Sequence, residues 1–324
     1  MSRPQETFGA SPGTSGAFDG EITVSADGLP AWLDPVVRAA ETVEPEQLSR
    51  FLPPDSGGRP SAVLILFGDG GGDGGGTDDG ETGSAVTDEM GAHNAGPHNA
   101  GPHSVGPHSA ATHEVGPHSA GTTPARPGAA DTSAVPGPAT APVRSDPAGP
   151  SATNGHRPEL LLMERAGTLR SHAGQPSFPG GALDPEDGDP RTVGPLRAAL
   201  REAWEETGLD PSGVQIFGAL PRLYIPVSGF VVTPVLGWWR APSPVAPVDP
   251  AETARVFTVP VAELTDPANR AVTTHPSGYQ GPAFLVRDAL VWGFTAGVID
   301  RLLHFAGWER PWDRSKHVPL DWSA

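Results

Sequence analysis

The sequence predicts one α/β or α+β domain with a mixed sheet, interrupted by a long insertion. Two observations support this fold class. Apolar stretches typical of buried strands are interspersed with a few amphipathic helical segments. The 324 residues also include 42 Gly and 39 Pro with only 37% hydrophobic residues, too many helix breakers for one uniform globule. We therefore expect part of the chain to lie outside the folded core.

The first part of the domain is expected at 28–67, after a small, polar and disordered N-terminal tail at 1–27. The segment "LPAWLDPVVRAAETVEPEQLSRFLPP" has amphipathic spacing and is bounded by prolines, which predicts helical structure. The apolar segment "SAVLILFGD" at 61–69 has the pattern of a buried strand. A first strand thus follows a helical start.

The second part of the domain is expected at 158–312, before a short C-terminal tail at 313–324. It contains several strand patterns and then an apolar-faced helix at 290–307. The predicted strands are 159–167, 213–220, 224–239 and 254–261. Together the two parts are large enough for one well-packed core.

A segment rich in Gly, Pro and His separates the two parts, at 68–157. Its composition cannot bury enough apolar surface to offset the entropy of ordering, so we predict a disordered insertion. Six histidines recur at intervals of five, from His93 to His118. Histidine tracts can bind transition metals, but the Gly and Pro in nearly every unit oppose a helix that would align the imidazoles. We favour a low-complexity expansion, and expect deletion of 70–156 to leave activity intact.

Charge and composition exclude several function classes. A net charge of −17 and a pI near 4.9 oppose a nucleic-acid backbone or an anionic membrane as partner. Zero cysteines exclude disulfides and a cysteine nucleophile. The start of the sequence has no apolar signal region, and no apolar run reaches the roughly 20 residues that a bilayer requires. We expect a soluble, cytoplasmic protein.

The stretch "LRAALREAWEETGLD" at 196–210 predicts a helix with a cluster of carboxylates. Side chains three and four positions apart share a face, so Glu202, Glu205 and Glu206 converge. Like charges at this spacing repel, and Mg²⁺ or Mn²⁺ would relieve the repulsion because both prefer oxygen ligands. The alternative is a solvated charged face with Arg201 and Glu205 paired. The apolar face is expected to hold Leu196, Leu200 and Trp204.

The nine residues "REAWEETGL" at 201–209 resemble the second half of the Nudix box, G-x5-E-x7-R-E-U-x-E-E-x-G-U. This resemblance implies an α/β/α sandwich and divalent-metal hydrolysis of a nucleoside diphosphate linked to another group. It implies that Glu202, Glu205 and Glu206 bind metal, with Glu205, Glu206 and Arg201 forming the catalytic set. Arg201 would orient a glutamate through a charge-assisted hydrogen bond.

The first half of the box departs from the pattern. Five residues lead from Gly181 to Asp187, which stands where the first glutamate is expected. Thirteen residues instead of seven then precede Arg201, a difference that an insertion of roughly "GDPRTV" explains. We take Asp187, with Glu186 as its neighbouring alternative, as a further metal ligand.

Just before the box, "LLMERAGTLRSHAGQPSFPGG" at 161–181 resembles the signature of coenzyme A pyrophosphatases, although Met163 replaces a threonine. The resemblance implies coenzyme A or an acyl derivative as the small-molecule substrate. A coenzyme A site needs cations for its phosphates, and arginine binds phosphate in a bidentate manner. The predicted substrate-binding residues are Arg165, Arg170, Phe178, Gly180 and Gly181.

Later segments resemble the same proteins, and two alternatives stay open. One is a Nudix enzyme for another substrate such as ADP-ribose or NADH. The other is a non-catalytic nucleotide-binding module. Glu252 could supply an extra ligand or base, and Phe178 or Trp292 could stack or pack. Partners other than the substrate are expected to exclude nucleic acid and membrane, and a homodimer is left open.

Overall fold

The computed structural model describes residues 6–8, 22–70, 155–167, 174–274, 278 and 280–320. Its compact unit comprises Met1–Gly74 and Arg144–Ala324. The second unit, Gly75–Val143, contains the histidine repeat and lies outside the described residues.

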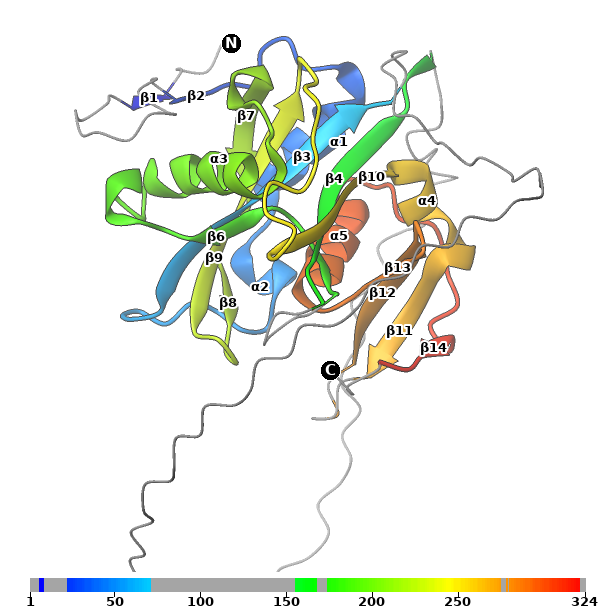
Figure 1. Cartoon of the computed structure of the whole chain (residues 1–324). Coiled ribbons are helices and arrows are strands. Elements are labelled where there is room, and N and C mark those ends of the chain that lie inside the picture. The colour runs from blue at the N-terminus through cyan, green and yellow to red at the C-terminus, as the bar shows by residue number, and fades with distance from the viewer. Residues whose placement is uncertain are drawn as a thin grey trace, which may run out of the picture. The chain divides into compact units, whose positions relative to one another are not determined.

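A mixed sheet forms the centre of the described unit (Figure 1). Its main strands follow the order β10-β4-β3-β9-β7, in which β3 and β9 are parallel and the other pairs antiparallel. The mixed sheet predicted from the sequence is therefore confirmed. The main strands are β3 (Arg59–Asp69), β4 (Pro158–Arg165), β7 (Val214–Ala219), β9 (Phe230–Trp239) and β10 (Thr253–Pro260). Short strands β5 (Pro176–Ser177), β6 (Gly180–Ala182) and β8 (Leu223–Ile225) pair with β4, β3 and β9.

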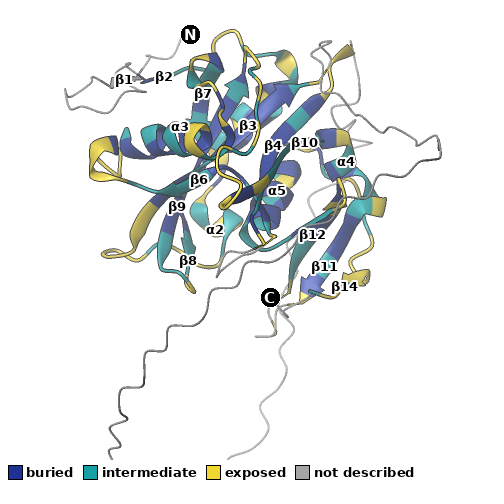
Figure 2. Ribbon diagram, in the orientation of Figure 1, coloured by how far each residue is buried: buried dark blue, intermediate teal, exposed yellow. Residues whose placement is uncertain are grey.

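Helices cover both faces of this sheet, and the alternation along β3 shows why. Leu64 and Leu66 belong to the core beneath α3 (Gly194–Thr207). Ile65 and Phe67 belong to the core beneath α1 (Asp34–Thr42) and α5 (Gly293–Phe305). Successive side chains of a strand point to opposite faces, so one strand supplies both cores. The dark central strands in Figure 2 mark this doubly buried layer.

The helix α3 is bounded as its sequence predicts. Proline occupies its first turn, and Gly208 ends it with a φ of 69°. Its inner face is lined with small residues such as Ala199 and Ala203, so the helix can approach β3 closely. The prediction that Trp204 lies on this face is wrong, because Trp204 is 44% exposed. Each residue advances about 100° around a helix, which turns Trp204 away from the stripe centred on Ala203.

A second sheet with the order β13-β12-β11-β14 lies beside α5 and was not expected from the sequence (Figure 1). Its strands are β11 (Arg270–Thr274), β12 (Gln280–Val286), β13 (Ala289–Val291) and β14 (His317–Val318). The buried guanidinium of Arg270 forms an ion pair with Asp300 of α5 and lies against the rings of Phe284 and Trp312. This buried pair connects β11 to α5.

Further short elements complete the described chain. β1 (Glu6–Phe8) pairs with β2 (Ile22–Val24), and the backbone N–H of Ser25 donates to the carbonyl of Ile216. Described elements thus extend on both sides of the expected domain bounds. The remaining helical elements are η1 (Ala31–Leu33), α2 (Pro45–Leu48), η3 (Pro185–Asp187), η4 (Pro211–Gly213), α4 (Val261–Thr265) and η5 (Pro267–Asn269). In the described part of the chain, no helix is long and apolar enough to span a membrane.

The strands that flank the insertion are joined tightly at its base. Asp69 is opposite Pro158 in the β3–β4 ladder. The backbone N–H of Gly70 donates to the carbonyl of Arg157 at 2.9 Å, and the N–H of Arg157 donates to Asp69 Oδ1 at 2.8 Å. The hairpin is therefore closed by its own hydrogen bonds before the chain leaves the described residues.

Candidate active site

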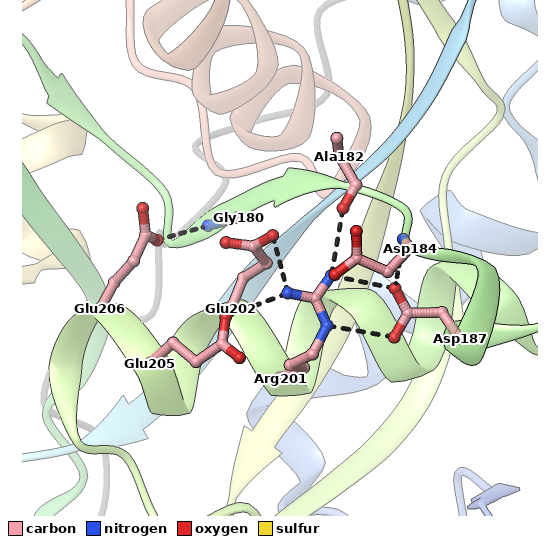
Figure 3. Close-up of polar contacts among 8 residues, drawn as sticks. All are labelled: Gly180, Ala182, Asp184, Asp187, Arg201, Glu202, Glu205 and Glu206. Carbon is pink, nitrogen blue, oxygen red and sulfur yellow. Dashed lines mark hydrogen bonds and ion pairs between the residues drawn. The ribbon is translucent and has the colours of Figure 1, made fainter. Parts of the chain in front are cut away.

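The carboxylates of α3 face the short strand β6 (Figure 3). The backbone N–H of Gly180 donates to Glu206 Oε2 at 2.9 Å. At Gly181, a Cβ atom would overlap the carboxylate of Glu202, so glycine lets that side chain keep its present position. Gly180 in turn lies so close to β3 that a Cβ would overlap the backbone of Ala62 and Val63. The two glycines therefore allow β6 to fit between β3 and the glutamates.

Arg201 is the centre of the hydrogen bonds in the site (Figure 3). Its Nε and Nη2 donate to the two carboxylate oxygens of Asp187 at 3.2 and 2.9 Å. Its Nη1 donates to Glu202 and to Glu205, both at 3.0 Å, and Nη2 also donates to the carbonyl of Ala182 at 3.1 Å. Burial lowers the pKa of Arg201, but the hydrogen bonds that it donates to Asp187 and the surrounding carboxylate charges outweigh burial and raise the pKa above its ordinary value. The guanidinium is therefore a permanent cation.

Asp187 occupies a different place from the helix glutamates. It ends the short helix η3, is 4% exposed, and also accepts the backbone N–H of Asp184 at 2.8 Å. Both of its carboxylate oxygens are thus engaged by donors of the protein. Glu186, the neighbouring alternative, is exposed to solvent. The extra residues 188–193 lie between η3 and α3, so the box accommodates them without interrupting the helix.

Burial dominates the electrostatics of the two inner glutamates. Burial and the charge of Glu202 raise the pKa of Glu206, the Gly180 hydrogen bond and the charge of Arg165 lower it, and the net result is a pKa of about 7. Burial also raises the pKa of Glu202, against the opposing charge of Arg201. The charge of Glu252 acts on Glu206 too, so Arg165 at the end of β4 and Glu252 in the turn before β10 both act on this carboxylate. Glu205, by contrast, is 46% exposed.

The donor chemistry of this cluster suits a divalent cation, although the side chains are not arranged around one. Among the described residues, no three acidic or histidine side chains are grouped as a ready ligand set. Glu202 and Glu205 are instead turned to Arg201. Glu206 is half-buried and accepts one backbone N–H, and a carboxylate withdrawn from water is costly to ionise without a positive partner. Oxygen ligands of this kind are those that Mg²⁺ and Mn²⁺ prefer.

The predicted substrate residues have different locations. Arg165 ends β4, is half-buried, and acts electrostatically on Glu206, so it lies near the carboxylates. Arg170 lies outside the described residues. Phe178 is 2% exposed and belongs to the core, which favours packing over stacking on a substrate. A phenylalanine beside glycines gave no signal in the sequence to distinguish core packing from ligand stacking.

Two groups that contact Arg201 could not be predicted from the sequence. The carbonyl of Ala182 and the carboxylate of Asp184 both lie against the Arg201 guanidinium, the latter at 3.4 Å. They reach it because β6 and the following turn bend around the side of α3 (Figure 3). The pattern of the box predicts the charges on the helix but not the path of this turn.

Comparisons with known proteins identify the family of the chain. A family model described as NUDIX domain matches residues 149–279. A Cronobacter sakazakii protein named as an uncharacterized Nudix hydrolase, NudL, is 41% identical over 148 residues, covering 45% of this chain and 73% of that protein. The chain belongs to the Nudix hydrolase family. A NudL protein of Photorhabdus laumondii is 38% identical over 149 residues, covering 45% of this chain and 76% of the relative.

Among solved structures, the Nudix hydrolase RenU of M. smegmatis matches with a TM-score of 0.33 and 20% identity. The match covers 49% of this chain and 82% of that chain. In this Nudix hydrolase, the box begins at Gly181, passes through Asp187 and ends at Leu209. Its charged residues are brought together around Arg201 by the contacts described above.

Proposed function

We propose that this Nudix hydrolase cleaves the diphosphate of coenzyme A or an acyl-coenzyme A, with Mg²⁺ or Mn²⁺ as cofactor. The products are 4′-phosphopantetheine, or its acyl form, and 3′,5′-ADP. One observation carries the proposal. The hydrogen bond from Gly180 to Glu206 joins the end of the segment that resembles the coenzyme A pyrophosphatase signature to the glutamate helix of the box. The segment that would select the substrate is thus in direct contact with the carboxylates that would hold the metal.

The three glutamates of α3 would act as the metal ligands. Glu202, Glu205 and Glu206 would hold the cation, after Glu202 and Glu205 turn from Arg201. When bound, a divalent cation stabilises negative charge on the phosphoryl oxygens and lowers the pKa of a bound water. Water adds to one phosphorus while the bond from that phosphorus to the bridging oxygen breaks, so each product ends in a phosphate monoester.

Other residues position these groups. Gly180 fixes the carboxylate of Glu206 through its N–H, and Arg165 adds positive charge beside it. We assign Asp187 a positioning role in place of metal binding, because its two oxygens already accept from Arg201 and Asp184. By holding Arg201 at the edge of the cluster, Asp187 sets where the guanidinium meets the helix glutamates.

The test is to incubate the purified protein with coenzyme A, ADP-ribose and NADH, each with Mg²⁺ and with Mn²⁺, and to identify products by mass. Selective release of 4′-phosphopantetheine and 3′,5′-ADP supports the proposal. Preferential cleavage of ADP-ribose or NADH would support hydrolase activity but refute coenzyme A as the substrate. Nucleotide binding without turnover favours a non-catalytic module.

Matched variants connect the activity to the site. Glu206→Gln removes a charge from the cluster but keeps an oxygen for the Gly180 N–H, and it should lower kcat by about 100-fold or more. Glu186→Gln is the control, because Glu186 is exposed and next to Asp187. It should retain wild-type turnover. Wild-type turnover in Glu206→Gln would defeat the assignment.

A further inference from the structure

A groove lies at the end of α3 opposite to Glu206. It consists of two adjoining hollows of about 530 and 170 Å³. They share the walls formed by Pro53, Pro54, Asp55, Arg191 and Arg222. Pro195, in the first turn of α3, lines the smaller hollow. At a rise of 1.5 Å per residue, Glu202 is roughly 10 Å from Pro195 along the helix. The groove is therefore separate from the carboxylate cluster but close to it.

Prolines and one glycine restrain the backbone around the groove. Prolines are frequent in its walls, and each proline has a restricted backbone. The floor of the smaller hollow includes Val231 and Thr233 of β9, whose hairpin with β8 lies below α3 in Figure 1. Gly58 has a φ of 87°, and a Cβ there would lie 2.6 Å from the Val231 side chain. A larger residue at this position would disturb the floor, so glycine preserves the hollow.

The groove presents two unengaged cations. In the described part of the chain, neither the Arg191 nor the Arg222 guanidinium has a hydrogen bond or an ion pair, and both side chains are exposed. The backbone of Arg191 is held in place, since its N–H donates to Asp189 Oδ1 at 2.8 Å. Asp55 and Glu46 also line the larger hollow but form no ion pair with either arginine among the described residues. The formal charges of these four residues cancel, so binding depends on direct contacts.

This combination matches one chemical class of ligand. Guanidinium groups bind phosphate monoesters through paired, charge-assisted hydrogen bonds. Carboxylates accept hydrogen bonds from an exocyclic amine, and proline walls offer apolar surface to a flat base. The class is an adenosine nucleotide that carries a phosphate monoester away from its reacting diphosphate.

We propose that this groove binds the 3′-phosphoadenosine end of the substrate, with Arg191 and Arg222 contacting the 3′-phosphate. The proposal rests on the proposed coenzyme A activity and specifies how that substrate is selected. Arg191 belongs to the extra residues 188–193 within the box. Those residues therefore bring a cation to the groove. The whole chain has a net charge of −17 and the charged residues of the groove cancel, so an anionic substrate would be held here by direct hydrogen bonds from the two guanidinium groups.

Direct binding tests the groove without catalysis. Titration calorimetry in EDTA would compare 3′,5′-ADP with 5′-AMP, which lacks only the 3′-phosphate. Arg191→Gln and Arg222→Gln should each weaken 3′,5′-ADP binding by about 10-fold or more, and leave 5′-AMP binding unchanged. Arg240→Gln is the matched control, because Arg240 is another exposed arginine and does not line the groove. Equal 3′,5′-ADP affinity in wild type and both groove variants overturns the proposal.

Kinetic measurements then distinguish the role of the groove in substrate selection from the proposed coenzyme A diphosphatase activity. The ratio of kcat/KM for coenzyme A to that for 3′-dephospho-coenzyme A should fall about 10-fold in each groove variant. An unchanged ratio overturns the assignment to the substrate, even if 3′,5′-ADP binding depends on the same arginines. If wild type does not cleave coenzyme A but 3′,5′-ADP binding still requires both arginines, the activity is refuted and the phosphate site remains supported.

Discussion

Replacement of Glu206 with glutamine should stabilise the metal-free protein at neutral pH. The folded protein raises the pKa of this carboxyl from 4.5 to about 7, mainly by burial. In the unfolded chain the group loses its proton near pH 4.5, whereas in the folded protein it keeps the proton until about pH 7. Between these values the unfolded state binds fewer protons, so the free energy of unfolding falls as pH rises.

The size of the effect follows from the same values. Between pH 4.5 and about 7, the free energy of unfolding of the wild-type protein should fall by about 1.4 kcal/mol per pH unit. The total loss of stability across this window is about 3 kcal/mol. Glutamine does not titrate, and its amide oxygen can still accept the N–H of Gly180. The difference in free energy of unfolding between Glu206→Gln and wild type should therefore be about 3 kcal/mol larger at pH 8 than at pH 4.5, in favour of the variant.

Urea denaturation in EDTA from pH 4.5 to 8 measures this difference. Groups other than Glu206 titrate in both proteins, so their contributions largely cancel in the comparison. Glu205→Gln is the control, because Glu205 is 46% exposed and exposed ion pairs contribute at most about 1 kcal/mol. Added Mg²⁺ or Mn²⁺ should then stabilise wild type more than Glu206→Gln. Parallel pH profiles for wild type and Glu206→Gln would refute the reasoning.

Three other substitutions test separate parts of the structure. Gly181→Ala should displace the Glu202 carboxylate and weaken Mn²⁺ binding by about 10-fold or more in calorimetry, because a Cβ overlaps that side chain. Asp187→Ala should lower the free energy of unfolding in urea by about 3 kcal/mol, because Arg201 loses its most buried partner; a change below about 0.5 kcal/mol would contradict the positioning role. Gly297→Ala should raise the free energy of unfolding by about 0.5–1 kcal/mol in the same assay, since this glycine lies within α5 with no atom within 4 Å of an added Cβ.

Local patterns predicted the elements that carry the chemistry. The charges and end signals of α3 are all within one short segment, so its three glutamates could be placed on one helix from sequence. The strands flanking the insertion were likewise predicted, because buried strands are continuous apolar runs. These are features in which each residue interacts mainly with its own element or with one face of the sheet.

Features that depend on distant contacts could not be predicted. Asp187 meets Arg201 across fourteen positions of sequence, and its engagement with Arg201 and Asp184 follows from the turn before α3. Phe178 is buried because segments far from it in sequence complete the core around it. The sheet formed by β11 and its neighbours is held to α5 through the buried Arg270–Asp300 pair, thirty residues apart. No local pattern of charge or hydropathy encodes such pairings.

The closed base of the β3–β4 hairpin makes the site where the insertion leaves the domain a practical entry point for engineering. The ladder ends with bonds that link Asp69, Gly70 and Arg157. Closing a longer connection costs entropy that grows only slowly with its length. A reporter protein whose termini lie close together could therefore replace 71–154, joined to the hydrogen-bonded ends of β3 and β4.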